Sequence, residues 1–138
     1  MDFAGIENFT IKTLEDTLPC ILTYHNARHT KEVIAVCREF AALEHITGDD
    51  LTILLTAACL HDTGFLVQYK KNEQLACAFA RKSLPRFGYS SGDIERICRI
   101  IMTTVIPQQP SQDILEKIIC DADLSYLGTD SFFEKADL

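Results

Sequence analysis

Residues 50–62 form the stretch that most restricts how this chain can fold. Their sequence, DLTILLTAACLHD, carries apolar side chains on nearly every side of a helix. A helix that is apolar all round has to be enclosed by other elements. The stretch is also shorter than the roughly 20 apolar residues that span a bilayer. It therefore predicts a central core helix in a globular fold, with no membrane span.

Helical periodicity continues through the rest of the chain. Apolar residues recur at three- and four-residue steps in four further segments, at residues 30–45, 72–88, 90–104 and 112–128. Strand signals are poor, because alternation is not sustained and no Asn-Gly or Asp-Gly hairpin lies between β-branched runs. We therefore expect an all-α fold, a compact single-domain bundle of five or six helices over residues 1–138.

Several helix boundaries can be predicted from capping residues. Thr30 and Ser90 are expected N-caps, because their hydroxyls can accept hydrogen bonds from the first turn of a helix. Gly48, after Thr47, and Gly88 are expected to follow helix ends. The final segment, TDSFFEKADL, is similar to the start of one more helix. Either it packs as a short terminal piece or the chain is part of a longer protein.

The charge balance argues against some classes of partner. The net charge of −7 disfavours a broad nucleic-acid surface, which needs a basic face, although a local group of lysines could bind a phosphate. The start, MDFAGIENFT, lacks the basic and long apolar stretches of a secretory signal. We expect a cytoplasmic protein that binds neither nucleic acid nor membrane. Its oligomeric state stays open, and a homo-oligomer is compatible with the sequence.

Six cysteines are spread along the chain without a Cys-x-x-Cys pair. Five of them stand among apolar residues within the predicted helices. In a cytoplasmic protein this pattern favours reduced, buried thiols over disulfides. The spacing also argues against a metal site built from cysteines.

Three of the four histidines stand in two short motifs. The motif YHNARHT sets His25 and His29 four residues apart, which places both on one face of a helix. His29 also heads an apolar stripe at three- and four-residue steps, so we expect it to face inward. His61, in the motif LHDTGF, lies at helical spacing from Leu54 and is also expected to face inward.

These histidines have two interpretations. A single inward histidine is more often a hydrogen-bonded core residue than a metal ligand. A histidine doublet together with an inward His-Asp pair in one helical domain is harder to explain in that way. A histidine from one helix, a His-Asp pair from another and a carboxylate from a third could form a site for a first-row divalent metal.

Four motifs follow one another along the chain: YHNARHT, LHDTGF, NE at residues 72–73, and DADLSYLG at residues 121–128. In order, spacing and residue type they resemble the HD-domain superfamily of metal-dependent phosphohydrolases. The resemblance covers about residues 18–133. In that all-α superfamily a His, a His-Asp pair and a distant Asp bind one metal. The resemblance implies four metal ligands here, His29, His61, Asp62 and Asp123.

The opening YHN, with a second histidine four residues later, is also similar to cyclic-nucleotide phosphodiesterases of the superfamily. That resemblance implies that His25 is the general acid that protonates the leaving oxygen. Asp62 would both bind the metal and orient or deprotonate the attacking water. Two imidazoles with two carboxylates suit one divalent ion of manganese, iron, cobalt, nickel or zinc, and suit magnesium less well.

Other polar residues have less distinctive patterns. Three basic residues could bind the phosphate of a substrate, or could be solvated surface charges: Arg28, Lys70 and Lys71. Glu73 could bind a second metal or a ligand imidazole, or could cap the next helix. Asp121 is an alternative to Asp123 that can equally face solvent. His45 is expected at the surface.

These observations predict a metal-dependent phosphohydrolase that cleaves a phosphomonoester or phosphodiester with a metal-activated water. The expected substrate is a small phosphorylated molecule, with a nucleotide as the leading class. One alternative is a non-catalytic HD module that binds a metal or nucleotide as a sensor. Another is a helical scaffold with hydrogen-bonded core histidines, which would contain no metal when purified.

Overall fold

The structure, a computed structural model, describes residues 1–17, 20–61, 73–104 and 113–125, without the side chains of residues 17–27 and 123–125. Every element in these ranges is a helix. The elements are α1 (Phe3–Thr17), α2 (Cys20–Leu43), α3 (Gly48–Leu60), α4 (Glu73–Ser83), the 3-10 helix η2 (Leu84–Phe87), α5 (Ser91–Met102) and α6 (Ile114–Ser125). The six α-helices of this part of the chain confirm the predicted all-α fold.

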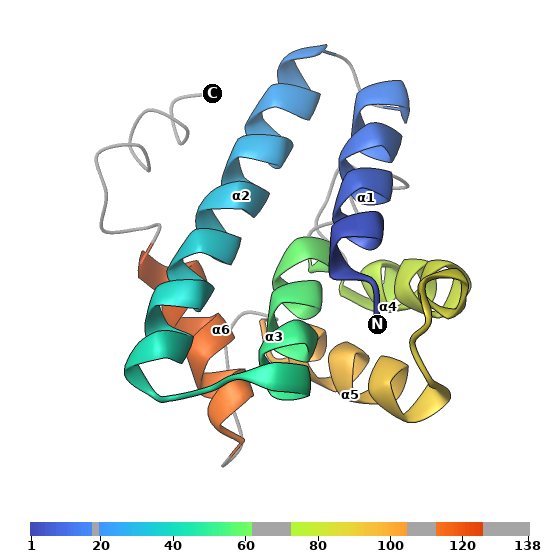
Figure 1. The fold of residues 1–138 in the computed structure, drawn as a ribbon. Helices are drawn as coiled ribbons and strands as arrows, with labels where there is room; N and C mark the ends of the chain where they lie inside the picture. Colours follow the sequence, from blue (N-terminus) through green and yellow to red (C-terminus); the bar gives the residue numbers. More distant parts are fainter. Residues whose placement is uncertain (18–19, 62–72, 105–112, 126–138) are drawn as a thin grey trace.

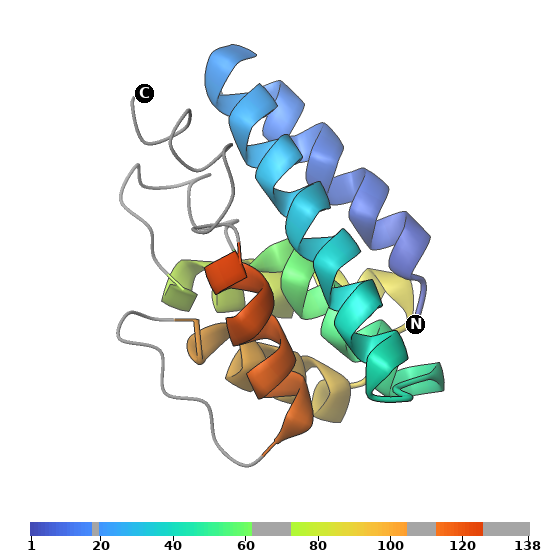
Figure 2. The same cartoon turned by 90° about the vertical axis from the view of Figure 1, so that its left-hand side faces the viewer.

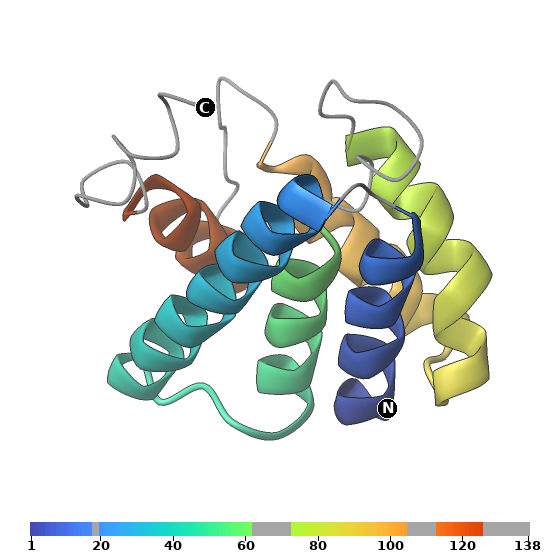
Figure 3. The same ribbon diagram turned by 90° about the horizontal axis from the view of Figure 1, so that it is seen from above.

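The central helix is α3, and the other helices enclose it. It packs against α1, α2, α4, α5 and α6, and Figure 3 shows it between α1 and α2. Residues 53–60 are all buried, so that α3 is covered by protein on every side. This arrangement confirms the core helix that the apolar stretch at residues 50–62 predicts. None of the described helices is both long enough and apolar enough to cross a membrane.

The first helix, α1, has no counterpart among the predicted segments. It runs antiparallel to α2, as Figure 1 shows, and packs against both α2 and α3. Asp2 caps it, because its carboxylate accepts a hydrogen bond of 2.9 Å from the Gly5 N–H. Its buried face consists of Ile6, Thr10 and Leu14. This stripe is hard to recognise in the sequence because a threonine occupies its centre.

The predicted start of α2 is wrong, whereas its predicted end at residue 45 lies two residues after the last helical residue, Leu43. The helix begins ten residues before Thr30, at Cys20, and Thr30 is a buried residue inside it instead of an N-cap. The sequence from Cys20 onward contains no proline or glycine, so nothing stops the helix from starting early. At the other end, His45 adopts a φ of 58°, and the Ile46 N–H donates to the Ala41 carbonyl at 2.8 Å. This αL turn ends the helix before Gly48, which instead begins α3.

The boundaries of α4 and α5 follow the sequence more closely. The segment of α4 and η2 ends at Gly88, whose φ of 82° is a conformation that glycine adopts without strain. Ser90 caps α5 as predicted, with a hydrogen bond of 3.1 Å from the Asp93 N–H to its hydroxyl. The Asp93 carboxylate accepts a hydrogen bond from the Ser90 N–H in return, which completes a capping box.

One buried hydrogen bond joins α3 to the turn before α5. The Thr56 hydroxyl donates to the Thr52 carbonyl at 2.7 Å, so its oxygen is left to accept from the Tyr89 hydroxyl at 2.6 Å. Burial raises the pKa of the Tyr89 phenol, although the hydrogen bond to Thr56 opposes that rise. The Tyr89 hydroxyl therefore stays a donor at neutral pH.

Replacing Thr56 should destabilise the fold more than replacing Tyr89. We expect Thr56→Val to lower the free energy of unfolding by about 1–3 kcal/mol, because the buried Tyr89 hydroxyl loses its acceptor. Tyr89→Phe should cost only about 0.5–1.5 kcal/mol, since Thr56 still donates to Thr52. Urea denaturation followed by circular dichroism measures both values. The free energy of unfolding of the double variant should be close to that of Tyr89→Phe alone. A loss equal to the sum of the two single losses would contradict this account.

Candidate metal centre

Three helices that carry predicted metal ligands pack against one another. They are α2, which contains His29, α3, which ends just before His61, and α6, which contains Asp123. Figure 2 shows α2 and α6 at the front of this group, with α3 behind them. The fold therefore brings together chain segments that are far apart in the sequence.

His61 is held at the buried end of α3. It is the C-cap residue of the helix, and its backbone N–H still donates to the Ala57 carbonyl at 3.0 Å. The side chain is buried, with only 2% of the residue exposed. Its ring nitrogen Nδ1 lies 2.7 Å from the carbonyl oxygen of Ala58, one turn earlier in the same helix. The predicted inward orientation of His61 is confirmed.

The contact with Ala58 fixes the tautomer of the His61 ring. A backbone carbonyl can only accept a hydrogen bond, so Nδ1 has to carry the proton. The neutral ring then holds its lone pair on Nε2, which is also buried. Metal-binding histidines commonly have this arrangement, in which one ring nitrogen donates to a carbonyl and the other binds the metal.

His29 places a second imidazole beside the first. It lies in the middle of α2, half-buried, and its Nδ1 atom is buried. The centroids of the His29 and His61 rings are 5.7 Å apart, with an angle of 60° between the ring planes. Two imidazoles that bind one ion at about 2.1 Å have ring centroids roughly 4.6–5.6 Å apart, so the observed separation is within a few tenths of an ångström of this range. The two rings are thus close enough to share one divalent ion, and their nitrogen donors fit such an ion.

The carboxylates of the predicted site are not described. Asp62 lies outside the described residues, and so do Lys70 and Lys71. Asp123 is within α6, and His25 is within α2 one turn before His29, but their side chains lie outside the described part. Among the side chains that the structure describes, no three His, Cys, Asp or Glu residues form a group suited to a metal. The roles of these residues therefore stay predictions.

Arg28 lies beside His29 on the solvent side of α2. Its Nε atom is 3.3 Å from a carboxylate oxygen of Glu32, one turn later. Both side chains are more than a third exposed, and such a pair contributes only about 0.3–0.5 kcal/mol. The ion pair is therefore weak enough for a phosphate to compete with it. Binding of a substrate phosphate by Arg28 stays a prediction.

Three further polar residues can be placed. Asp121 and His45 are both exposed, as expected for solvated side chains. Glu73 is the first residue of α4 and is buried, with 7% of the residue exposed. Both interpretations of Glu73, as a helix cap and as a partner of a metal or ligand imidazole, stay predictions.

Sequence reasoning missed the carbonyl of Ala58, which orients His61. An alanine side chain gives no signal for this role, because the backbone performs it. A usable signal is the position of His61 at the end of a helix, where the last carbonyl oxygens have no intrahelical partner. A histidine one turn later can reach such an oxygen.

Comparison with protein families supports the interpretation of the motifs. Residues 26–125, more than two thirds of the 138-residue chain, match the HD domain. The chain belongs to the HD domain family. HD domains are typical of metal-dependent phosphohydrolases and generally bind divalent metals, although some HD modules are non-catalytic. Searches of curated proteins and of solved structures found no significant match.

The matched range separates the predicted ligands from the predicted general acid. All four predicted metal ligands lie within residues 26–125, whereas His25 is the residue just before this range. The family match therefore supports a metal-binding fold and leaves the role of His25 as a prediction.

The tautomer of His61 can be tested directly. In long-range ¹H–¹⁵N correlation spectra of the metal-free protein, the neutral His61 ring should carry its proton on Nδ1, because the Ala58 carbonyl requires a donor. The exposed His45 is the internal control, since water can satisfy either of its ring nitrogens. A proton on Nε2 of His61 would contradict the assignment, because that nitrogen could then not bind a metal.

Proposed function

We propose that the protein is a metal-dependent phosphohydrolase that cleaves a phosphomonoester or phosphodiester, with a nucleotide as the leading substrate class. The observation that carries this proposal is the pair of imidazole rings of His29 and His61, 5.7 Å apart in an HD domain. A hydrogen-bonded core histidine explains His61 alone. It gives no reason for a second histidine ring against the first.

The proposed metal ligands come from four positions, His29, His61, Asp62 and Asp123. Two neutral imidazoles and two carboxylates leave a divalent ion nearly neutral and favour manganese, iron, cobalt, nickel or zinc over magnesium. When bound, such an ion lowers the pKa of water and withdraws charge from a phosphoryl oxygen. We infer one ion per chain.

The chain's own residues would position the substrate and move protons. The Ala58 carbonyl keeps the His61 ring in the tautomer that places the lone pair on Nε2. Asp62 would accept a proton from the attacking water, and His25 would donate a proton to the leaving oxygen. Three basic side chains would bind the phosphate, those of Arg28, Lys70 and Lys71.

The second candidate is a non-catalytic HD module that binds a metal or nucleotide as a sensor. The family match is compatible with it, because some HD modules are non-catalytic. A chain that holds the ion but lacks a working general acid would bind a phosphate without cleaving it. The two candidates share the metal ligands and differ in turnover.

Metal content and hydrolysis should be lost together when a ligand is removed. We expect the purified protein to contain about one divalent ion per chain by elemental mass spectrometry. It should also hydrolyse at least one substrate in a panel of nucleoside monophosphates, cyclic nucleotides, nucleoside triphosphates and a generic phosphodiester. His61→Ala and Asp62→Ala should each lose most of the metal and the activity. Unaltered metal content in either variant would contradict the site.

Matched variants distinguish loss of the metal through removal of a ligand from loss of the metal through any nearby substitution. Asp123→Ala should lose the metal, whereas Asp121→Ala, two residues away and exposed, should keep it. His45→Ala, which removes an exposed histidine, should leave both metal and hydrolysis unchanged. His25→Ala should keep the metal and lower turnover by about 10²–10⁴, as expected for a general acid. A wild-type protein that holds the metal but hydrolyses nothing in the panel would support the sensor.

A further inference from the structure

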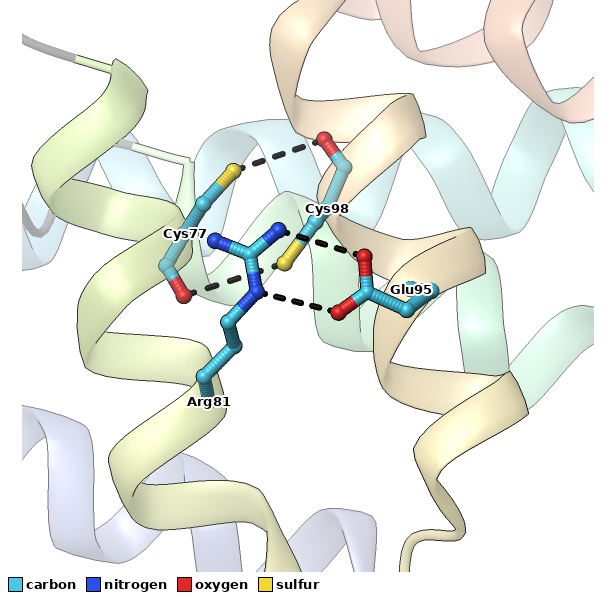
Figure 4. Close-up of polar contacts among 4 residues, drawn as sticks. All are labelled: Cys77, Arg81, Glu95 and Cys98. Atoms are coloured by element: carbon cyan, nitrogen blue, oxygen red, sulfur yellow. Dashed lines mark hydrogen bonds and ion pairs between the residues drawn. The ribbon is translucent and has the colours of Figure 1, made fainter.

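Two cysteines meet where α4 packs against α5. The Cys77 thiol donates to the Cys98 carbonyl at 3.5 Å, and the Cys98 thiol donates to the Cys77 carbonyl at 3.7 Å. Figure 4 shows both sulfur atoms in the space between the two helices. Reciprocal contacts of this kind place each sulfur against the backbone of the opposite helix.

A surface cavity of about 310 Å³ reaches this pair. Both cysteines line it, together with Gln74, Arg81, Glu95, Arg99 and Met102. Arg81 donates two hydrogen bonds to the Glu95 carboxylate, at 3.0 and 3.2 Å, and both side chains are more than half exposed. Each cysteine is only 3% exposed. The cavity therefore brings small solutes to the thiols, while larger reagents are held back.

The surroundings shift the pKa values of the two thiols in opposite directions. Once Cys98 is deprotonated, the Cys77 thiol beside it can turn from the Cys98 carbonyl and donate a hydrogen bond to the thiolate. This hydrogen bond lowers the pKa of Cys98, and the Arg81 guanidinium lowers it further, against the effects of burial and of Glu95. The same hydrogen bond raises the pKa of Cys77, and burial adds to this rise. Cys59 provides a contrast, because burial raises the pKa of its thiol to about 12. Thiolates are the reactive form of cysteine, so Cys98 is the expected nucleophile.

We propose that Cys77 and Cys98 form a peroxide-reactive pair that closes to a disulfide between α4 and α5. The Cys98 sulfur attacks one peroxide oxygen, the O–O bond breaks, and Cys98 becomes a sulfenic acid while the other oxygen leaves as water. The Cys77 sulfur then attacks the Cys98 sulfur, and the S–O bond breaks with loss of a second water. The two thiols give up two electrons and two protons, and hydrogen peroxide is reduced to two molecules of water.

Cys120 offers a matched control within the same chain. It is 3% exposed, as are Cys77 and Cys98, and its thiol also donates to a backbone carbonyl, that of Thr103, at 3.4 Å. Exposure and hydrogen bonding to a carbonyl thus predict equal reactivity for all three thiols. The proposal predicts a difference, because Cys98 has a thiol and a guanidinium beside it.

The test is peroxide treatment of the reduced full-length chain in its folded state. Remaining thiols are then alkylated under denaturing conditions, and the peptides are identified by mass spectrometry. We expect a Cys77–Cys98 disulfide, formed roughly tenfold faster than oxidation of Cys120. Oxidation of Cys120 at the same rate as the pair, or no disulfide while circular dichroism shows a folded protein, would overturn the proposal.

Two variants test the order of the steps. In Cys77→Ser the reaction should stop at a sulfenic acid on Cys98, which dimedone traps. In Cys98→Ser no disulfide should form, and Cys77 should stay a thiol. A dimedone adduct on Cys77 with none on Cys98 would contradict the assignment of the nucleophile. Because the mapping of the wild-type protein needs no substitution, the disulfide itself stays testable if a variant fails to fold.

Discussion

The hydrogen bond between Nδ1 of His61 and the carbonyl of Ala58 is the contact on which the candidate centre depends. It uses a carbonyl oxygen near the end of α3, where the intrahelical hydrogen bonds run out. It also satisfies one nitrogen of a buried imidazole and leaves the lone pair on the other. One contact therefore satisfies a carbonyl near the end of the core helix and places the His61 ring in the tautomer that the proposed metal site needs.

The burial of α3 explains why the helices that carry other predicted ligands pack against it. A helix with buried residues from 53 to 60 requires other helices on every side, and these include α2 and α6. His29 lies on the first and Asp123 on the second. The same hydrophobic packing that stabilises the fold thus places the two helices that carry predicted ligands against α3. The membership of the chain in the HD domain family agrees with this use of the fold.

Much of this arrangement could be predicted from the sequence, wherever the signal was local. The apolar stretch at residues 50–62, the Ser90 cap and the inward His61 all depend on neighbours within a few residues. The helix α1 was not predictable in the same way, because Thr10 interrupts its apolar stripe. Thr30 was a poor guide to the start of α2. A threonine looks the same in the sequence whether it is buried inside a helix or caps the start of one.

Contacts between helices could not be predicted from one sequence. The separation of Cys77 and Cys98 in the sequence does not predict that these two residues meet where α4 packs against α5. The 5.7 Å separation of the His29 and His61 rings likewise depends on how α2 packs on α3. Motif resemblance supplied the expectation that the two histidines meet. The side chains of Asp62 and Asp123 lie outside the described residues, so their part in the centre stays a prediction.

The central claim is that His29 and His61 bind the same cation. The most direct measurement is a titration of the metal-free protein with diamagnetic Zn²⁺, followed by the ring ¹⁵N shifts of the histidines in NMR spectra. A shared ion predicts that one ring nitrogen of His29 and Nε2 of His61 both change to the shift of a metal-bound nitrogen by about one equivalent, while the ring of the exposed His45 is unchanged. A metal-bound shift at only one of the two rings, or at the two rings at different equivalents, would contradict a common metal centre.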